Sequence, residues 1–264
     1  MSTLRAERVT KAFGGVVAVK NASIDLEDGV VAGLIGPNGA GKSTFLSILS
    51  GFLRPDSGKV TLDKHDVSRI GPSHTARLGL VRTFQEAAPI AGLSVLDNVR
   101  VGMHTRFHNG PFSAILHLPS ARHEETALRH QAQFLLAEVG LSNLADVNAS
   151  RLTFGQLRFL EIARALAASP RLLLLDEPTA GLNATESQLL AELIGRIRQS
   201  SGLGLLLVDH NVPFLFNLCD RITVMNYGEI IAEGAPRHIE KDPAVHAAYL
   251  GTEESVELEV TVEA

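Results

Sequence analysis

The feature that most constrains this chain is a glycine-rich loop between a buried strand and a helix. Residues 30–35 form a continuous apolar run, as expected of a strand buried on both faces of a parallel sheet. The loop that follows matches G-x-x-x-x-G-K-[ST] and reads Gly36-Pro37-Asn38-Gly39-Ala40-Gly41-Lys42-Ser43-Thr44. Apolar residues then recur at helical spacing, at Phe45, Leu46, Ile48 and Leu49. This order predicts an α/β fold.

Such a loop is suited to hold the phosphates of a nucleotide. Its glycines let successive backbone N–H groups turn inward, and the helix N-terminus adds a favourable dipole. Lys42 would place its charge on the β- and γ-phosphates, and the Ser43 hydroxyl would ligate Mg²⁺. We therefore expect ATP and Mg²⁺ as ligands. A chance glycine turn before Lys-Ser is the alternative, and the flanking strand and helix argue against it.

A second motif places two carboxylates at the end of another buried strand. Four leucines, at 172–175, precede Asp176, Glu177 and Pro178. In open α/β sheets ligands bind at the carboxyl edge of the strands. Asp176 is expected to hold the Mg²⁺ shell and Glu177 to polarise the attacking water. The alternative is a surface Asp-Glu pair without a function at the end of a strand, and the presence of the phosphate loop argues against it.

Charge and cysteine content exclude several other classes of protein. The 264 residues carry 24 Lys and Arg against 29 Asp and Glu. Residues 252–264 hold five Glu and no basic residue, so residues 1–251, the body of the chain, contain 24 basic and 24 acidic residues. A neutral body offers no electrostatic footprint for nucleic acid, and we expect no such partner. With Cys219 as its single cysteine, the chain cannot form an internal disulfide or a four-thiolate zinc site.

The apolar runs suggest that the chain reaches a membrane only through partners. The longest runs, at 30–35 and 203–208, are far shorter than the ~20 residues that span a bilayer. The first ten residues contain no apolar run and do not resemble a secretory signal.

The pattern along the chain predicts one domain at 1–251 with a helical subdomain at about 90–168. Leu128, Ala132, Leu135, Leu136 and Val139 recur on one helix face, and Gly140 is a plausible cap. Gly110-Pro111 and Leu118-Pro119 are expected to break this block. Before it, the apolar runs at 16–19 and 22–26 predict strands. After it, Asn183 and Glu186 resemble a capping box, and Asn226-Tyr227-Gly228 predicts a hairpin. The helix after the capping box is expected to have one apolar face, made of Leu189, Leu190, Leu193, Ile194 and Ile197. The acidic tail at 252–264 is expected to be disordered.

The segment between the two motifs resembles a particular family. Leu152-Thr153-Phe154-Gly155-Gln156 is similar to the LSGGQ signature of ABC-transporter ATPases and ends 20 residues before Asp176. Other positions of that family follow in order, namely Phe13 for the adenine-stacking aromatic, Gln85 for the Q-loop, residues 180–183 for the D-loop and His210 for the switch histidine. The resemblance covers residues 4 to 251.

The resemblance implies the ABC ATPase fold, which is a P-loop core with an antiparallel β subdomain and an inserted α-helical subdomain. It implies a dimer in which the signature motif of one subunit faces the ATP held by the other. Gln85 would reach Mg²⁺ and water, and His210 would contact the γ-phosphate. Two departures stand out. Thr153 replaces the usual Ser and keeps its hydroxyl, and Phe154 replaces a Gly. Leu157, where Gln is common, is a smaller one.

Within that family, three segments resemble the ATPase subunits of bacterial branched-chain amino-acid importers. They are residues 13–19, the insertion at 102–140 and the end at 242–251. The resemblance implies permease subunits, a second ATPase subunit (identical or related) and, indirectly, an external substrate-binding protein. It also implies a peripheral location on the cytoplasmic face of the inner membrane.

Other functions remain open at this point. Importers of urea and short amides and the lipopolysaccharide exporter have similar ATPases, and residues 202–211 resemble the exporter's as well. Soluble ABC ATPases outside transport usually carry two modules or a coiled-coil insertion, neither of which occurs here. A regulatory subunit that does not hydrolyse ATP would lack Glu177 or His210. Five histidines crowd the insertion and are expected to be solvated rather than metal-bound, namely His104, His108, His117, His123 and His130.

Overall fold

The computed structural model describes residues 3–84, 88–103 and 119–249, and residues 119–124 are described by their backbone alone. The described chain divides into two compact units. The first comprises residues 3–84, 171–180 and 194–249, and the second comprises residues 88–103, 119–170 and 181–193. The second unit includes most of the segment expected to be a helical subdomain and, in addition, residues 181–193.

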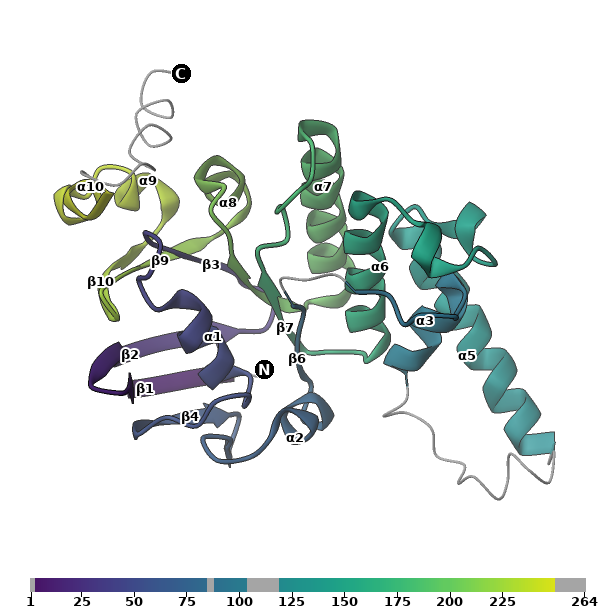
Figure 1. The fold of residues 1–264 in the computed structure, drawn as a ribbon, viewed down its shortest axis with the longest axis horizontal. Coiled ribbons are helices and arrows are strands. Elements are labelled where there is room, and N and C mark those ends of the chain that lie inside the picture. Colours follow the sequence, from purple (N-terminus) through teal and green to yellow (C-terminus); the bar gives the residue numbers. More distant parts are fainter. Residues whose placement is uncertain (1–2, 85–87, 104–118, 250–264) are drawn as a thin grey trace. The chain divides into compact units, whose positions relative to one another are not determined.

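A six-stranded sheet organises the first unit (Figure 1). Its order is β10-β9-β3-β8-β7-β6, and all neighbours are parallel except β10 and β9. The strands are β3 (Val31–Ile35), β6 (Leu80–Arg82), β7 (Leu172–Asp176), β8 (Gly204–Val208), β9 (Arg221–Asn226) and β10 (Glu229–Gly234).

The three central strands of this sheet are buried along their whole length. Every residue of β3, β7 and β8 is buried, which confirms the interpretation of the apolar runs. Val208 pairs with Asp176 on one side and with Leu34 on the other, so the carboxyl ends of these strands lie at one edge. The loops after β3, β7 and β8 therefore start from neighbouring points.

A second sheet in the same unit is antiparallel, in the order β2-β1-β4-β5. The apolar runs at 16–19 and 22–26, both expected to be strands, are parts of one strand, because β2 continues through the polar residues between them. The polar step between them is a bulge in the pairing with β1, and Asn21 there has a positive φ of 48°. The strands are β1 (Thr3–Phe13), β2 (Val16–Glu27), β4 (Ser57–Leu62) and β5 (His65–Asp66).

Helix α1 (Lys42–Leu49) joins the two sheets in one core. Its apolar residues, with Phe45 fully buried, belong to the same cluster as side chains of β1, β2 and β4 and of β3, β7 and β8. The helix that follows the phosphate loop is thus held on both sides. A short helix, α2 (Pro72–Arg77), precedes β6.

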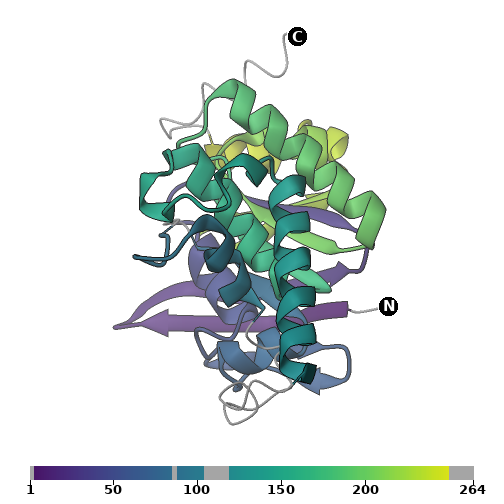
Figure 2. The ribbon, with the colours of Figure 1, turned by 90° about the vertical axis from the view of Figure 1, so that its right-hand side faces the viewer.

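The second unit is helical, as the apolar spacing predicted. Helices α3, α5 and α6 pack on one another (Figure 2). All five residues of the expected stripe are buried, four of them on α5 and Val139 directly after it, and Gly140 follows with a φ of 74°. Pro119 begins α5, whereas Gly110, Pro111 and Leu118 lie outside the described residues. The elements are α3 (Val95–Gly102), α5 (Pro119–Glu138), η2 (Ser142–Leu144), η3 (Ala149–Arg151) and α6 (Phe154–Ala167).

Helix α7 (Ala184–Ser201) begins at the expected capping box. The Asn183 N–H donates to Glu186 at 3.0 Å, and the Glu186 N–H donates to Asn183 Oδ1 at 2.9 Å. Leu190, Leu193, Ile194 and Ile197 are buried. Leu189, which we placed on the same face, is 50% exposed, because it lies at the margin of the apolar stripe.

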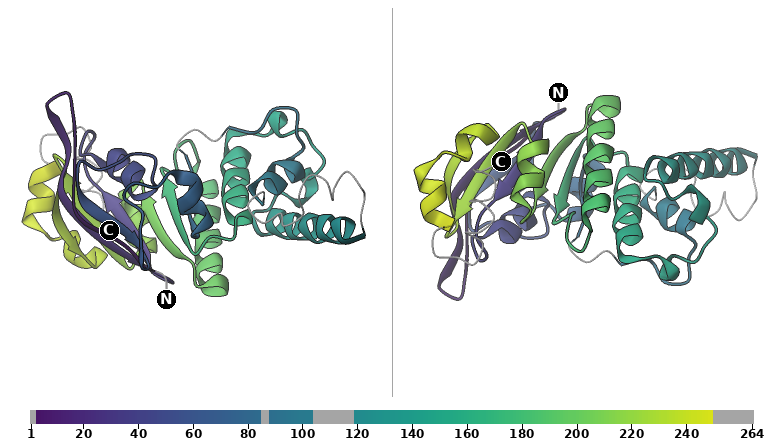
Figure 3. Two further views of the ribbon diagram at one scale, coloured as in Figure 1. Left: turned by 90° about the horizontal axis from the view of Figure 1, so that it is seen from below. Right: turned by 90° about the horizontal axis from the view of Figure 1, so that it is seen from above.

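The end of the described chain packs on the six-stranded sheet. The hairpin β9–β10 turns at Tyr227 and Gly228, both with positive φ, as the Asn-Tyr-Gly signal predicted. Pro213 lies in the first turn of α8 (Val212–Leu218). Helices α9 (Pro236–Ile239) and α10 (Pro243–Tyr249) contact β10 (Figure 3). The acidic tail lies outside the described residues.

Replacing Phe45 with Ala should lower the free energy of unfolding by about 3–5 kcal/mol, since it removes a buried ring and leaves a cavity in the core. The matched control is Phe134→Ala, since Phe134 is 62% exposed, and its effect should stay within about 0.5 kcal/mol. Urea unfolding followed by circular dichroism measures both. Equal losses for the two variants would contradict the assignment of the core.

Candidate functional site

The backbone of the phosphate loop passes too close to its neighbours for side chains at two glycines. A Cβ on Gly36 would lie 2.0 Å from the carbonyl oxygen of Met225, and one on Gly41 would lie 2.2 Å from that of Ala18. Both residues also have positive φ, at 151° and 101°. These positions therefore require glycine for steric as well as conformational reasons.

The loop and the start of α1 form one side of a pocket of about 240 Å³. Gly41 is the N-cap of α1 and has no side chain to cap the helix, and the residues of the first turn line the pocket. The Lys42 ammonium lies within the loop and donates to the carbonyl oxygens of Gly36 and Pro37. The pocket is lined by Ala18, Asn38, Gly39, Ala40, Gly41, Lys42, Ser43, Thr44, Glu177 and His210.

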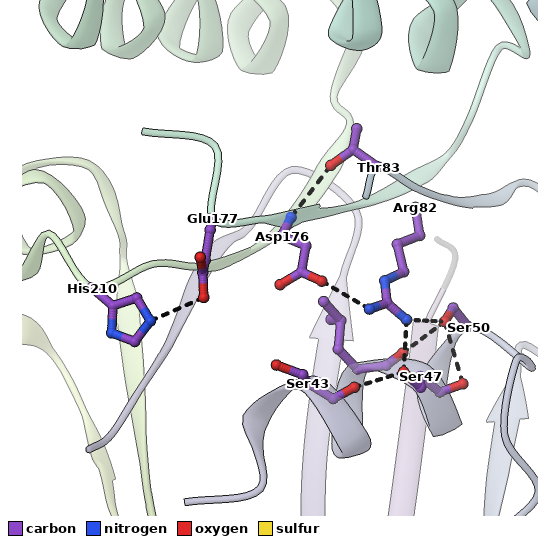
Figure 4. Close-up of polar contacts among 9 residues, drawn as sticks. Ser43, Ser47, Ser50, Arg82, Thr83, Asp176, Glu177 and His210 are labelled. Carbon is purple, nitrogen blue, oxygen red and sulfur yellow. Dashed lines mark hydrogen bonds and ion pairs between the residues drawn. The ribbon is translucent and has the colours of Figure 1, made fainter. Parts of the chain in front are cut away.

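Glu177 and His210 meet at the opposite side of this pocket (Figure 4). His210 Nε2 lies 2.9 Å from Glu177 Oε1. Glu177 has a positive φ of 47°, and its N–H donates to the Val208 carbonyl at 2.7 Å. A non-glycine residue in this region is strained, and such strain is common where a side chain is held for chemistry. The fold thus brings together two residues that are 33 positions apart.

A buried aspartate joins the loops that carry these two residues. Asp209 is 4% exposed and accepts from both the N–H and the hydroxyl of Thr179, at 2.9 and 2.7 Å. It also accepts from the Asn211 N–H at 3.0 Å. Sequence reasoning missed this contact, and adjacency to Glu177 and His210 was the only available signal.

Asp176 is held from two directions at the end of β7. Its Oδ2 accepts from Arg82 Nη2 at 2.8 Å, and its N–H donates to the Thr83 hydroxyl at 3.3 Å (Figure 4). The side chains of Arg82 and Asp176 are 8% and 6% exposed, and neither residue lines the pocket directly. Sequence reasoning did not find Arg82 or Thr83. Their neighbour Gln85, expected to reach Mg²⁺, lies outside the described residues.

Phe13, expected to stack on adenine, ends β1 and is 49% exposed. The Lys11 ammonium lies 5.5 Å from the centre of its ring. Lys11 also pairs with Asp56 and, through that hydrogen bond, lowers the pKa of the carboxyl. Phe13 does not line the pocket, although Ala18 of the adjoining β2 does.

The signature segment lies in the second unit and caps its own helix. The Gln156 N–H donates to the Thr153 hydroxyl at 3.3 Å, and the Thr153 N–H donates to Gln156 Oε1 at 3.0 Å. These two bonds form a capping box at the start of α6. Leu152 before it is buried and anchors the segment.

The aromatic residue in this segment packs against the loop that precedes α7. A Cβ on Gly181 would lie 2.4 Å from the Phe154 ring, and the Arg158 guanidinium lies 5.7 Å from the ring centre. A Cβ on Gly155 would lie 2.1 Å from a carboxylate oxygen of Glu186. The ring therefore lies beside Gly181, and a side chain at Gly155 would require the Glu186 carboxylate to move.

Cys219 is buried, and burial raises the pKa of its thiol, so a thiolate nucleophile is disfavoured there. His104, His108 and His117 lie outside the described residues. Within residues 3–84, 88–103 and 119–249, no three His, Cys, Asp or Glu side chains gather as a metal site would require. No helix in these ranges has the length and hydropathy needed to cross a membrane.

Comparison with known proteins agrees with this geometry. The model of the ABC transporter family matches residues 19–180, and that of the branched-chain amino acid ATP-binding cassette transporter family matches residues 229–255. The ATP-binding protein LivG of Salmonella typhimurium, named for high-affinity branched-chain amino acid transport, is 39% identical over 90% of this chain and 94% of its own. The lipopolysaccharide export protein LptB of Acidithiobacillus ferridurans is 36% identical over 94% and 96%.

A solved structure shows the same fold. The ADP conformation of MJ1267, an ATP-binding cassette of an ABC transporter, superposes with a TM-score of 0.82 at 32% identity and covers 95% of this chain and 99% of its own. The chain therefore belongs to the ABC transporter family and has the fold of its ATP-binding cassettes. This confirms the expected fold class and the expected family.

Gly181→Ala should destabilise the protein because its methyl group would overlap the Phe154 ring. Overpacking costs about 1–3 kcal/mol, and the left-handed backbone at φ 74° adds about 1–2 kcal/mol. In a Phe154→Ala background only the backbone cost should remain. Urea unfolding of the four proteins of this double-mutant cycle measures the difference. An equal loss in both backgrounds would show that the ring does not fill this space.

Proposed function

We propose that this chain is the ATP-hydrolysing subunit of a membrane transporter that imports branched-chain or related amino acids. The observation that carries the proposal is the 39% identity to LivG along 94% of the latter's length. The match of residues 229–255 to the branched-chain cassette model adds support from a different part of the chain.

Lipopolysaccharide export is the second candidate, supported by the 36% identity to LptB. The two candidates share the ATPase and differ in what its hydrolysis drives. The branched-chain match at residues 229–255 favours the importer, because it lies beyond the part matched by the general ABC model.

In the proposed reaction, the phosphate loop binds the phosphates of ATP. The backbone N–H groups of residues 38–44 surround the phosphates, and the helix dipole of α1 adds to their attraction. Lys42 now donates to two loop carbonyls, and we propose that it exchanges them for phosphate oxygens. Phe13 would pack on the adenine.

The residues near Asp176 fit Mg²⁺ chemically. The Ser43 hydroxyl and the Asp176 carboxylate supply oxygen donors, which Mg²⁺ prefers. Asp176 Oδ2 is bound by Arg82, so Oδ1 is the oxygen available to the metal shell. When bound, Mg²⁺ would neutralise charge on the β- and γ-phosphates. Gln85 remains a proposed third contributor.

Glu177 is proposed as the base that orients the attacking water. Its carboxylate lies at the pocket opposite Lys42 and Ser43 and is braced by His210 at 2.9 Å. A base must lie within hydrogen-bond reach of the proton that it accepts. His210 would also contact the γ-phosphate, since it lines the same pocket.

The site is proposed to be completed by a second ATPase subunit, identical or related. The capped start of α6, with Thr153, Gly155 and Gln156, would present its N-terminus to ATP held by that subunit. Permease subunits at the cytoplasmic face of the membrane would receive the motion, and an external binding protein would deliver the substrate.

Glu177→Gln should keep ATP binding and lower kcat by about 10²- to 10⁴-fold, because the amide cannot accept the proton. The control Glu192→Gln changes an exposed carboxylate on α7 and should hydrolyse ATP as the wild type does. Phosphate release and binding of a fluorescent ATP analogue measure the two effects. Near-normal turnover by Glu177→Gln would remove the assigned role.

Transport is tested in host cells whose own copy carries Glu177→Gln. Uptake of labelled leucine should fall, while uptake of urea should be unchanged. Loss of urea uptake alone would assign the protein to amide import. Normal uptake of both, together with envelope defects, would support the lipopolysaccharide alternative.

A further inference from the structure

A buried arginine outside the recognised motifs contacts the aspartate proposed to hold the metal shell. Arg82, the last residue of β6, has a side chain that is 8% exposed, and that of Asp176 is 6% exposed. Arg82 Nη2 donates to Asp176 Oδ2 at 2.8 Å. A charge-assisted bond of this length between buried groups fixes the orientation of the carboxylate.

The same guanidinium also binds the helix that begins at the phosphate loop. Arg82 Nη1 donates to the hydroxyls of Ser47 at 3.0 Å and Ser50 at 3.3 Å, both on the α1 side (Figure 4). The Ser47 hydroxyl in turn donates to the Ser43 carbonyl at 2.7 Å. Arg82 therefore links Asp176 to the backbone of Ser43, and these are the two proposed Mg²⁺ ligands in the described chain.

Two aromatic rings restrict the arginine itself. The guanidinium carbon lies 5.9 Å from the ring centre of Phe52 and 5.7 Å from that of Phe84. The rings contact each other edge to face, with centres 5.2 Å apart. Cation–π contacts of this kind hold a planar guanidinium more firmly than they would hold a lysine ammonium.

We propose that Arg82 is a positioning residue for Mg²⁺, which sets the orientation of Asp176 relative to Ser43 before the metal–nucleotide complex binds. The inference rests on the proposed function, since it concerns the metal used for ATP hydrolysis. Arg82 does not touch the nucleotide in this proposal and acts through the carboxylate and through α1.

The expected direction follows from two opposing effects. Without Arg82 the carboxylate loses the bond on Oδ2 and can rotate, so the metal must order it on binding. Loss of a nearby positive charge would instead strengthen the attraction of Asp176 for Mg²⁺. Partners that orient metal ligands typically contribute about 10- to 100-fold in metal affinity, and we expect this effect to prevail.

The test compares nucleotide affinity with and without the metal on the full chain. A fluorescent, non-hydrolysable ATP analogue is titrated in Mg²⁺ and in EDTA. The Kd in EDTA divided by the Kd in Mg²⁺ reports how much the metal contributes to binding. Arg82→Met should reduce that ratio by about tenfold, with the affinity in EDTA within about twofold. Arg82→Lys keeps the charge but donates from a single nitrogen, so it cannot replace the contacts that Arg82 makes from two. Its ratio should lie between those of the wild type and Arg82→Met.

Two further variants keep the result interpretable. Ser47→Ala breaks the link to Ser43 without leaving a buried carboxylate unpaired, so it should reduce the ratio in the same direction even if Arg82→Met folds poorly. The matched control is Arg171→Met, because Arg171 pairs with Asp63 at the same 2.8 Å but is 51% exposed. Its ratio should equal that of the wild type.

Three results would overturn the proposal. The ratio could stay unchanged in Arg82→Met and Ser47→Ala, it could rise because the lost charge prevails, or affinity could fall equally in Mg²⁺ and EDTA, which would indicate a structural role alone. Failure of the proposed function is distinguishable, because the wild type would then show no Mg²⁺-dependent ATP hydrolysis.

Discussion

The close approach of the phosphate loop to two carbonyl oxygens is the constraint on which the rest of the site depends. Gly36 runs against Met225 and Gly41 against Ala18, so the loop is shaped by β9 and β2 as much as by its own residues. Helix α1 starts immediately after it and is packed between the two sheets. A loop held in this way can present its N–H groups to phosphate without first having to order itself.

The chemistry of the site depends on strand ends that meet at one edge. Because β3, β7 and β8 are parallel neighbours, the phosphate loop, Glu177 and His210 arise from adjacent positions in the sheet. Buried polar contacts then orient the side chains, with Asp209 on Thr179 and Arg82 on Asp176. In a region of low dielectric such paired groups are held strongly, which suits a site that must bind a highly charged ligand.

Much of this could be predicted from local pattern. The loop motif, the buried strands, the Asn183–Glu186 capping box and the β9–β10 hairpin depend on residues close together in the chain, and the structure confirms those elements. The continuity of β2 between residues 19 and 22 was not evident from the sequence, because the polar residues of a bulge within a strand resemble those of a turn between strands. Leu189 was misplaced because spacing alone does not define the edge of a buried face.

The sequence by itself determined the order of the main elements, the family and the residues proposed to carry the chemistry, since these follow from short motifs and their spacing. Only the tertiary structure decided which side chains support them. Arg82 and Asp176 are 94 positions apart, and nothing local in either segment indicates that they pair. The place of the Phe154 ring beside Gly181 was likewise open, because the direction of a side chain at a helix start depends on what packs against it. Such long-range contacts are set by how strands and helices pack, which a local pattern does not encode.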